Sequence, residues 1–149
     1  MPKFRIQVII NKPVELVYQG YINPDNMLHW TKDLEKFEVI KGKPMEIGSI
    51  ALLHFNKNGR THIMEDKLEF IEAEKKIVSC VAGGGLKARV QTNFVRLAKN
   101  TVLTLIWNGK GNNLIVRFVL IILRGKIRKQ ALSELNEFKL LVEKFGTVF

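Results

Sequence analysis

Cysteine is nearly absent from this sequence, and so are the features of a secreted protein. The one cysteine, Cys80, cannot form an intramolecular disulfide, which argues against a small disulfide-bonded scaffold. The opening residues, Met1, Pro2 and Lys3, lead directly into an alternating segment and not into the apolar stretch of a signal peptide. Together these absences predict a cytoplasmic protein.

Long apolar runs are missing as well. The longest, residues 114–123, includes Arg117, whereas a membrane-spanning helix needs about twenty apolar residues. We therefore expect no such helix. The chain has no internal repeat and no low-complexity segment, and its 149 residues, 46% of them hydrophobic, predict a single domain over residues 1–149.

Acidic residues are absent from the middle of the chain. The formal net charge is +10, and residues 75–129 hold 12 basic side chains and no acidic one. Such a block can attract nucleic acid, anionic lipid or an acidic protein, or it can be an ordinary solvated face. No aromatic residue alternates with Lys87 and Arg89, so we expect no specific nucleic-acid binding and only weak, salt-dependent association with anionic membranes.

Metal-binding and phosphate-binding motifs are also lacking. The three histidines, His29, His54 and His62, include no pair at a ligand spacing such as His-x-x-x-His. The glycines at 83–85 lack the strand-to-helix setting of a phosphate loop and are expected to form a turn. We therefore predict no metal and no cofactor.

The spacing of the apolar residues changes along the chain. Residues 3–10 alternate as in a half-buried strand, and two short helices are expected next, on either side of Asn23-Pro24. Between residues 34 and 109, turn residues separate six strand-length runs. From about residue 113 to residue 145 there is no proline, and apolar residues recur every three or four positions, which predicts one long helix.

The Asn58-Gly59 pair fixes the faces of one hairpin. A two-residue turn with positive φ at both positions suits Asn-Gly and sets the register of the flanking strands. This register opposes Ala51 to Asp66. It points one set of side chains toward the long helix: Leu53, Phe55, His62, Met64, Asp66, Leu68 and Phe70.

A second turn, expected at Lys99-Asn100, extends the same apolar face. It pairs Leu105 with Phe94 and Trp107 with Thr92. The residues expected to share the inner face on the preceding strand are Ala88, Val90, Thr92 and Phe94. Residues 77–82 are apolar on both faces, so their inward side stays unassigned.

Several local motifs accompany this order of elements. They are Asn11-Lys12-Pro13-Val14-Glu15-Leu16-Val17, Asn23-Pro24, Trp30, Gly42, Ile47-Gly48-Ser49, Gly125-Lys126, Leu135, Phe138-Lys139 and Leu141-Val142-Glu143. Together, the order and the motifs resemble the helix-grip superfamily (SRPBCC) over nearly the whole chain. That superfamily includes START-type lipid-transfer domains, birch-pollen-type allergens and bacterial polyketide cyclase or dehydratase-like proteins, and the long final helix is most similar to the bacterial branch.

The resemblance implies an α+β fold in which a curved seven-stranded antiparallel sheet wraps around the C-terminal helix. Two short helices would lie between strands one and two, and the sheet and helix would enclose a cavity for a hydrophobic small molecule or lipid. Family members include carriers and enzymes, so no catalytic residue is carried over. The expected ligand-binding residues are Leu53, Phe55, His62, Met64, Asp66, Phe70, Val90, Thr92, Phe94, Leu105, Trp107 and Phe118.

Asp66 and His62 are the candidate catalytic residues. An unpaired carboxyl on an apolar face would have a raised pKa and could act as acid, base or ligand anchor, unless it turns outward or pairs with Arg96. Binding of a hydrophobic ligand is our first hypothesis, a cyclase-like or dehydratase-like enzyme the second, and an interaction module that uses the basic block the third. The oligomeric state is left open.

Overall fold

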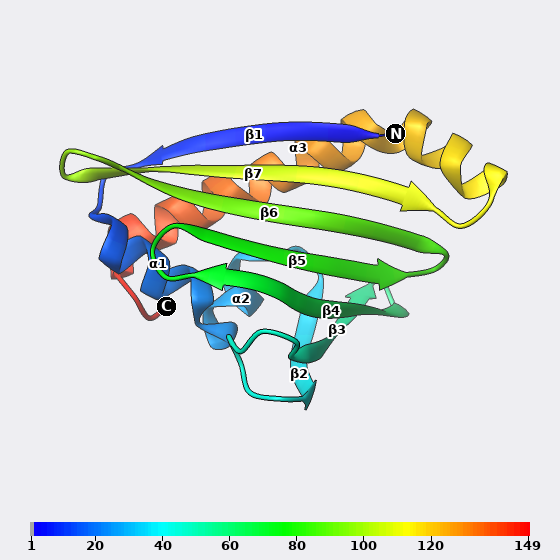
Figure 1. Cartoon of the computed structure of the whole chain (residues 1–149), viewed down its shortest axis with the longest axis horizontal. Coiled ribbons are helices and arrows are strands. Elements are labelled where there is room, and N and C mark those ends of the chain that lie inside the picture. The colour runs from blue at the N-terminus through cyan, green and yellow to red at the C-terminus, as the bar shows by residue number, and fades with distance from the viewer. Residues whose placement is uncertain (1) are drawn as a thin grey trace.

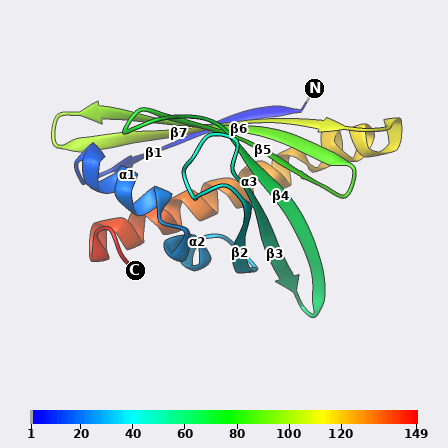
Figure 2. The same ribbon diagram turned by 60° about the horizontal axis from the view of Figure 1, so that its bottom comes forward.

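Seven strands form one antiparallel sheet, and three helices lie on one side of it (Figures 1 and 2). The computed structural model describes residues 2–149. The strands are β1 (Lys3–Ile10), β2 (Leu34–Lys41), β3 (Ile50–Lys57), β4 (Arg60–Glu72), β5 (Lys76–Gly83), β6 (Leu86–Leu97) and β7 (Asn100–Gly111). The helices are α1 (Val14–Ile22), α2 (Pro24–Trp30) and α3 (Leu114–Phe145).

The sheet order is β1-β7-β6-β5-β4-β3-β2, so β1 and β2 are its edges. Figure 2 shows the β3–β4 hairpin bending away from the other strands, which curves the sheet around α2 and the middle of α3. The predicted α+β fold, with its curved seven-stranded sheet, long final helix and two short helices between the first two strands, is confirmed.

Of the two turns from which the strand register was predicted, one lies where expected and the other does not. At Asn58-Gly59 both residues have positive φ, 53° and 83°, and the predicted pairing of Ala51 with Asp66 is confirmed. The second turn lies one residue earlier than predicted, because Ala98, at φ 54°, takes the left-handed conformation. Trp107 therefore pairs with Val90 and not with Thr92, a shift of two residues that keeps every side chain on its predicted face.

The prediction that Phe70 points inward is wrong. The pairing of β4 with β5 shifts between Leu68 and Phe70, as at a β-bulge, and every later residue of β4 changes side. Phe70 is 41% exposed, with the Lys76 ammonium 5.7 Å from its ring centre. Ile71 packs against the core in its place.

The core lies where the second half of α3 crosses the sheet beside α1. Leu135, Phe138 and Val142 of α3 are fully buried there. Further along the sheet, Phe4 of β1 stacks on Trp107 of β7 with ring centres 5.1 Å apart. Both rings are buried, so these two strands are held by side chains as well as by their hydrogen bonds.

The first half of α3 is covered on one side only. Leu120 is buried, and Val116 and Ile127 pack beside it against the core. Phe118, which we expected in the cavity, is 65% exposed, because it lies on the opposite side of the helix from Leu120, where no other element of residues 2–149 covers it. Within the described residues, no helix is long and apolar enough to cross a membrane.

Candidate functional site

A cavity of about 210 Å³ lies between the inner face of the sheet and the helices α2 and α3. Five of the predicted residues line it: Leu53, Asp66, Val90, Thr92 and Leu105. The inward side of β5, unassigned from the sequence, supplies Ile77, Ser79 and Val81. The remaining wall is Tyr21, Ile22, Asn23, Pro24, Met27, Trp30, Thr31, Phe37, Met45 and Glu134.

Five other residues predicted to bind ligand lie away from this cavity. Phe55 stacks on His62, with ring centres 4.9 Å apart, near the tip of the β3–β4 hairpin. His62 is exposed there, so it is not the acid or base of this cavity. Met64 packs against Gly83 on the neighbouring strand. Phe94 and Trp107 are buried in the core instead.

Asp66 is a polar group on this mostly apolar wall that lacks a full set of partners. Its Oδ1 atom is buried and has no hydrogen-bond partner within the described part of the chain. Burial raises the pKa of Asp66 to about 6, although a hydrogen bond from Ser79 opposes part of this shift. The side chain can therefore carry or release a proton close to neutral pH.

Tyr21 brings a hydroxyl to the same cavity from α1. Its Oη lies 2.9 Å from the Thr92 Oγ1 atom on β6, and its ring meets Phe94 and Phe138 edge-on. Burial raises the pKa of Tyr21 to about 12, and the nearby charges of Asp66 and Glu134 raise it further, against the hydrogen bond with Thr92. The phenol therefore stays protonated and can donate or accept a hydrogen bond.

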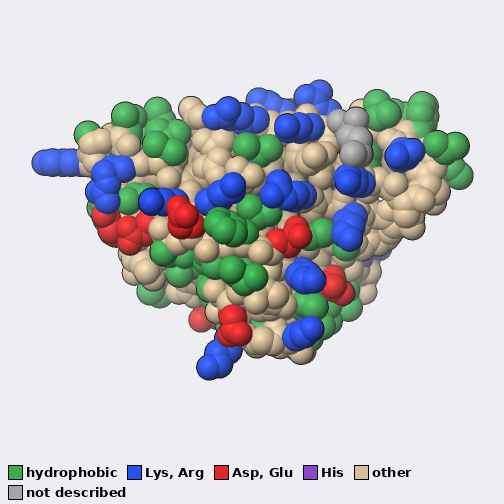
Figure 3. Space-filling model, viewed as in Figure 1, with side chains coloured by type: hydrophobic (Ala, Val, Ile, Leu, Met, Phe, Trp, Pro, Cys, Tyr) green, Lys and Arg blue, Asp and Glu red, His purple; other side chains and the backbone are tan. Residues whose placement is uncertain are grey.

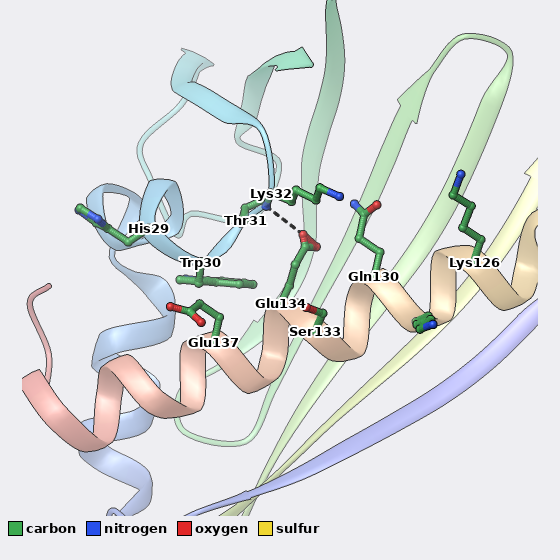
Figure 4. Close-up of a pocket in the computed structure, with 10 residues that line it drawn as sticks. His29, Trp30, Thr31, Lys32, Lys126, Gln130, Ser133, Glu134 and Glu137 are labelled. Carbon is green, nitrogen blue, oxygen red and sulfur yellow. Dashed lines mark hydrogen bonds between the residues drawn. The ribbon is translucent and has the colours of Figure 1, made fainter. Parts of the chain in front are cut away.

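Glu134 is a second carboxyl at the cavity, and the sequence reasoning missed it. Its Oε2 atom accepts a hydrogen bond of 3.1 Å from the Lys32 backbone N–H, which Figure 4 shows reaching from the loop after α2 to α3. Burial raises the pKa of Glu134 to about 7, although the hydrogen bond and the charge of Lys32 oppose the shift. The sequence offered one signal, since Glu134 directly precedes the inward-facing Leu135.

A groove between α2 and α3 adjoins the cavity. It measures about 500 Å³ and shares Trp30, Thr31 and Glu134 with the cavity wall. Figure 4 shows Gln130 and Lys126 extending from α3 on the side that faces the loop after α2. The other lining residues are His29, Lys32, Lys129, Ser133 and Glu137. The cavity with its two carboxyls thus lies beside a wider groove lined mostly by polar and charged side chains.

The cavity has the groups for binding and for proton transfer, and it has no cluster of metal ligands. Within residues 2–149, no three His, Cys, Asp or Glu side chains gather where they could hold a metal ion. Asp66 and Glu134 can each exist in either protonation state near neutral pH. The Trp30 Nε1 and Thr31 Oγ1 atoms are also buried without a partner in the described chain, so polar groups remain available at the junction with the groove.

The fold is shared with solved proteins of low sequence identity. Protein CV1439 from Chromobacterium violaceum is 17% identical, with a TM-score of 0.77 over 95% of this chain and 97% of its own. The Zhui aromatase/cyclase from Streptomyces sp. R1128 is 15% identical, with a TM-score of 0.77 over 95% and 93%. Ara h 8.0201 is 11% identical, with a TM-score of 0.73 over 95% and 97%.

These likenesses confirm the helix-grip fold. No family model matches the sequence, and no curated protein matches it either.

Proposed function

We propose that the protein binds a small, mostly apolar molecule with one hydrogen-bonding group in the cavity between the sheet and helices α2 and α3. The observation that carries this proposal is the buried, unpartnered Oδ1 atom of Asp66 on a mostly apolar wall. A polar atom buried without a partner destabilises a fold by about 1–3 kcal/mol. A ligand that hydrogen-bonds to Asp66 would remove that cost, while its apolar part is buried against Leu53, Val90 and Leu105.

The volume of the cavity limits the ligand. An apolar cavity of about 150 Å³ is enough to hold benzene, and the cavity here is about 210 Å³. The enclosed part of the ligand is therefore about the size of one substituted ring or a short chain. A whole lipid or sterol does not fit unless its remainder lies in the groove beyond Trp30.

The polar groups favour a hydroxyl or carbonyl on the buried part of the ligand. Protonated Asp66 can donate to a carbonyl oxygen, and ionised Asp66 can accept from a hydroxyl. Tyr21 can donate as well, because its phenol stays protonated. Purely aliphatic ligands would leave the Asp66 oxygen unpaired and should bind more weakly.

An NMR titration with 2-naphthol tests this proposal, because the probe combines an apolar ring system with one hydroxyl. We expect saturable shifts of the Leu53, Val90 and Leu105 resonances. Val90→Phe, which fills the cavity, should weaken binding about tenfold or more, whereas the outward-facing Phe70→Ser should leave it unchanged. Absence of saturable shifts, or equal binding to the Val90→Phe variant, would contradict the proposal.

An acid–base enzyme is the second candidate. The observation in its favour is that Asp66 and Glu134, from two walls of one cavity, have pKa values of about 6 and about 7, which suits general acid and base catalysis. A structural neighbour, Zhui, is described as an aromatase/cyclase.

Native mass spectrometry of the purified protein can identify a co-purified molecule with which the enzyme hypothesis is tested. A co-purified molecule would be returned to fresh protein, and a product lighter by one water would indicate a dehydration. The Asp66→Asn and Glu134→Gln variants should each slow that conversion about a hundredfold. Recovery of the unchanged molecule would leave binding as the function.

A further inference from the structure

The first three turns of α3 expose an apolar face that the cavity and the core do not use. Five large side chains form it, and each is at least 64% exposed: Leu114, Ile115, Phe118, Ile121 and Ile122. Their spacing places them on one side of the helix, opposite Leu120 and Val116, which pack against the core. Figure 3 shows hydrophobic side chains gathered at the end of the molecule where α3 begins.

This face, which we call the α3 apolar face, is bordered by positive charge alone. The flanking and following residues Arg117, Arg124, Lys126, Arg128 and Lys129 are all exposed. No acidic residue occurs in the chain between residue 75 and residue 133. The side chains that surround the apolar face therefore attract anions and present none of their own.

This charge pattern decides between the partners that could cover an apolar helix face. A second copy of the chain in a twofold dimer would bring the same arginines and lysines against each other, with no carboxylate among them to compensate. Nucleic acid would match the charge but would leave four aliphatic side chains without a suitable surface. A membrane with anionic lipid matches both features, because aliphatic side chains enter the acyl boundary while arginine and lysine reach the headgroups.

We propose that the α3 apolar face is a docking site for anionic membrane surfaces. The helix lies in the plane of the interface with Phe118 and Ile122 inserted below the headgroups. Arg117 and Arg128 pair with anionic lipid. The ten apolar-rich residues 114–123 are too short to cross a bilayer, so the attachment is peripheral. This proposal is independent of what the cavity binds.

Co-sedimentation with vesicles tests it on the full chain. We expect the protein to sediment with vesicles of phosphatidylcholine and phosphatidylglycerol, and about tenfold less with phosphatidylcholine alone. The double change Phe118→Ser and Ile122→Ser should lower partitioning about tenfold or more, because it removes the inserted apolar surface. Arg117→Gln with Arg128→Gln should lower it by a similar factor and reduce its dependence on salt.

Two matched pairs of changes serve as controls. Ile63→Ser with Val95→Ser removes apolar side chains that are 52% and 54% exposed elsewhere on the sheet. Lys87→Gln with Arg89→Gln removes two exposed positive charges from β6. Both control proteins should partition within about twofold of the unchanged chain, and circular dichroism melting establishes that all four variants are folded.

Three results would overturn the proposal. One is the absence of sedimentation with the anionic vesicles. Another is a loss of partitioning in the control variants as large as in the α3 variants, which would assign the attraction to general charge. The third is a dimer in analytical ultracentrifugation that Phe118→Ser with Ile122→Ser dissociates, because the α3 apolar face would then be the contact between two copies.

Discussion

Replacement of Asp66 by Asn should stabilise the protein at neutral pH and have a smaller effect in acid. The pKa of Asp66 rises from 3.8 to about 6 on folding because burial disfavours the charged form. The folded state therefore holds its proton more tightly than the unfolded state does. The corresponding stability is fully present below the unfolded pKa and is lost as the pH rises through the folded value.

The magnitude follows from the size of the shift. About two pKa units correspond to about 3 kcal/mol, which is the full destabilisation by the ionised carboxyl above about pH 7. At about pH 4.5 only about 1 kcal/mol of it is present, because this pH is less than one unit above the unfolded pKa of 3.8. Asp66→Asn should thus stabilise the fold by about 2 kcal/mol more at about pH 7.5 than at about pH 4.5.

Urea denaturation of both proteins at the two pH values measures this difference directly. Glu65→Gln is the matched control, because it removes a carboxylate from the other, exposed face of the same strand. An Asp66→Asn variant that is destabilised equally at both pH values would refute the reasoning, since it would show that the Asp66 carboxylate has a partner in the folded state.

Three further predictions concern other parts of the structure. The carboxyl of Glu134 should titrate in the folded protein with a midpoint near pH 7, as followed by NMR of its side-chain carbon, and a midpoint near the ordinary value of 4.5 would contradict its burial. Asn26→Ala should destabilise the fold by about 2–4 kcal/mol, since the buried amide of Asn26 bonds Gly20, Thr147 and Phe149. The Phe149 amide should then exchange with solvent much faster, whereas unchanged exchange would mean that other contacts hold this segment. Phe70→Ser should change the free energy of unfolding by less than about 1 kcal/mol, because the side chain is exposed. A loss of several kcal/mol would mean that Phe70 is packed in the core.

The sequence was sufficient for the fold because its local signals agreed with one another. Asn58-Gly59 set one register correctly, since both residues readily adopt positive φ. The second turn was misplaced because Ala98, a residue that rarely adopts positive φ, does so here. The side chains stayed on their predicted faces only because the resulting shift was an even number of residues.

The candidate site was harder to predict than the fold, because it depends on where elements end and bend. The bulge that turns Phe70 outward leaves no mark in the alternation of β4. Likewise, the pattern of α3 identified a helix but could not indicate that the sheet would leave Phe118 uncovered. Asp66 could be predicted because its position depends on one short hairpin. Glu134 reaches the same cavity only because α3 crosses the loop after α2, a contact between distant segments that no local pattern indicates.

The pairing of β1 with β7 has a consequence for how the chain folds during its synthesis. Ile6 of β1 pairs with Leu105, so the first strand has no neighbour in the sheet until about a hundred further residues have left the ribosome. Until then its apolar side, Phe4, Ile6, Val8 and Ile10, stays without the partners that bury it in the finished protein. Contacts this distant in sequence form slowly, and an unpaired apolar strand can associate with other chains in the meantime. A nascent chain stalled before residue 100 should therefore depend on chaperones more than one released after residue 111.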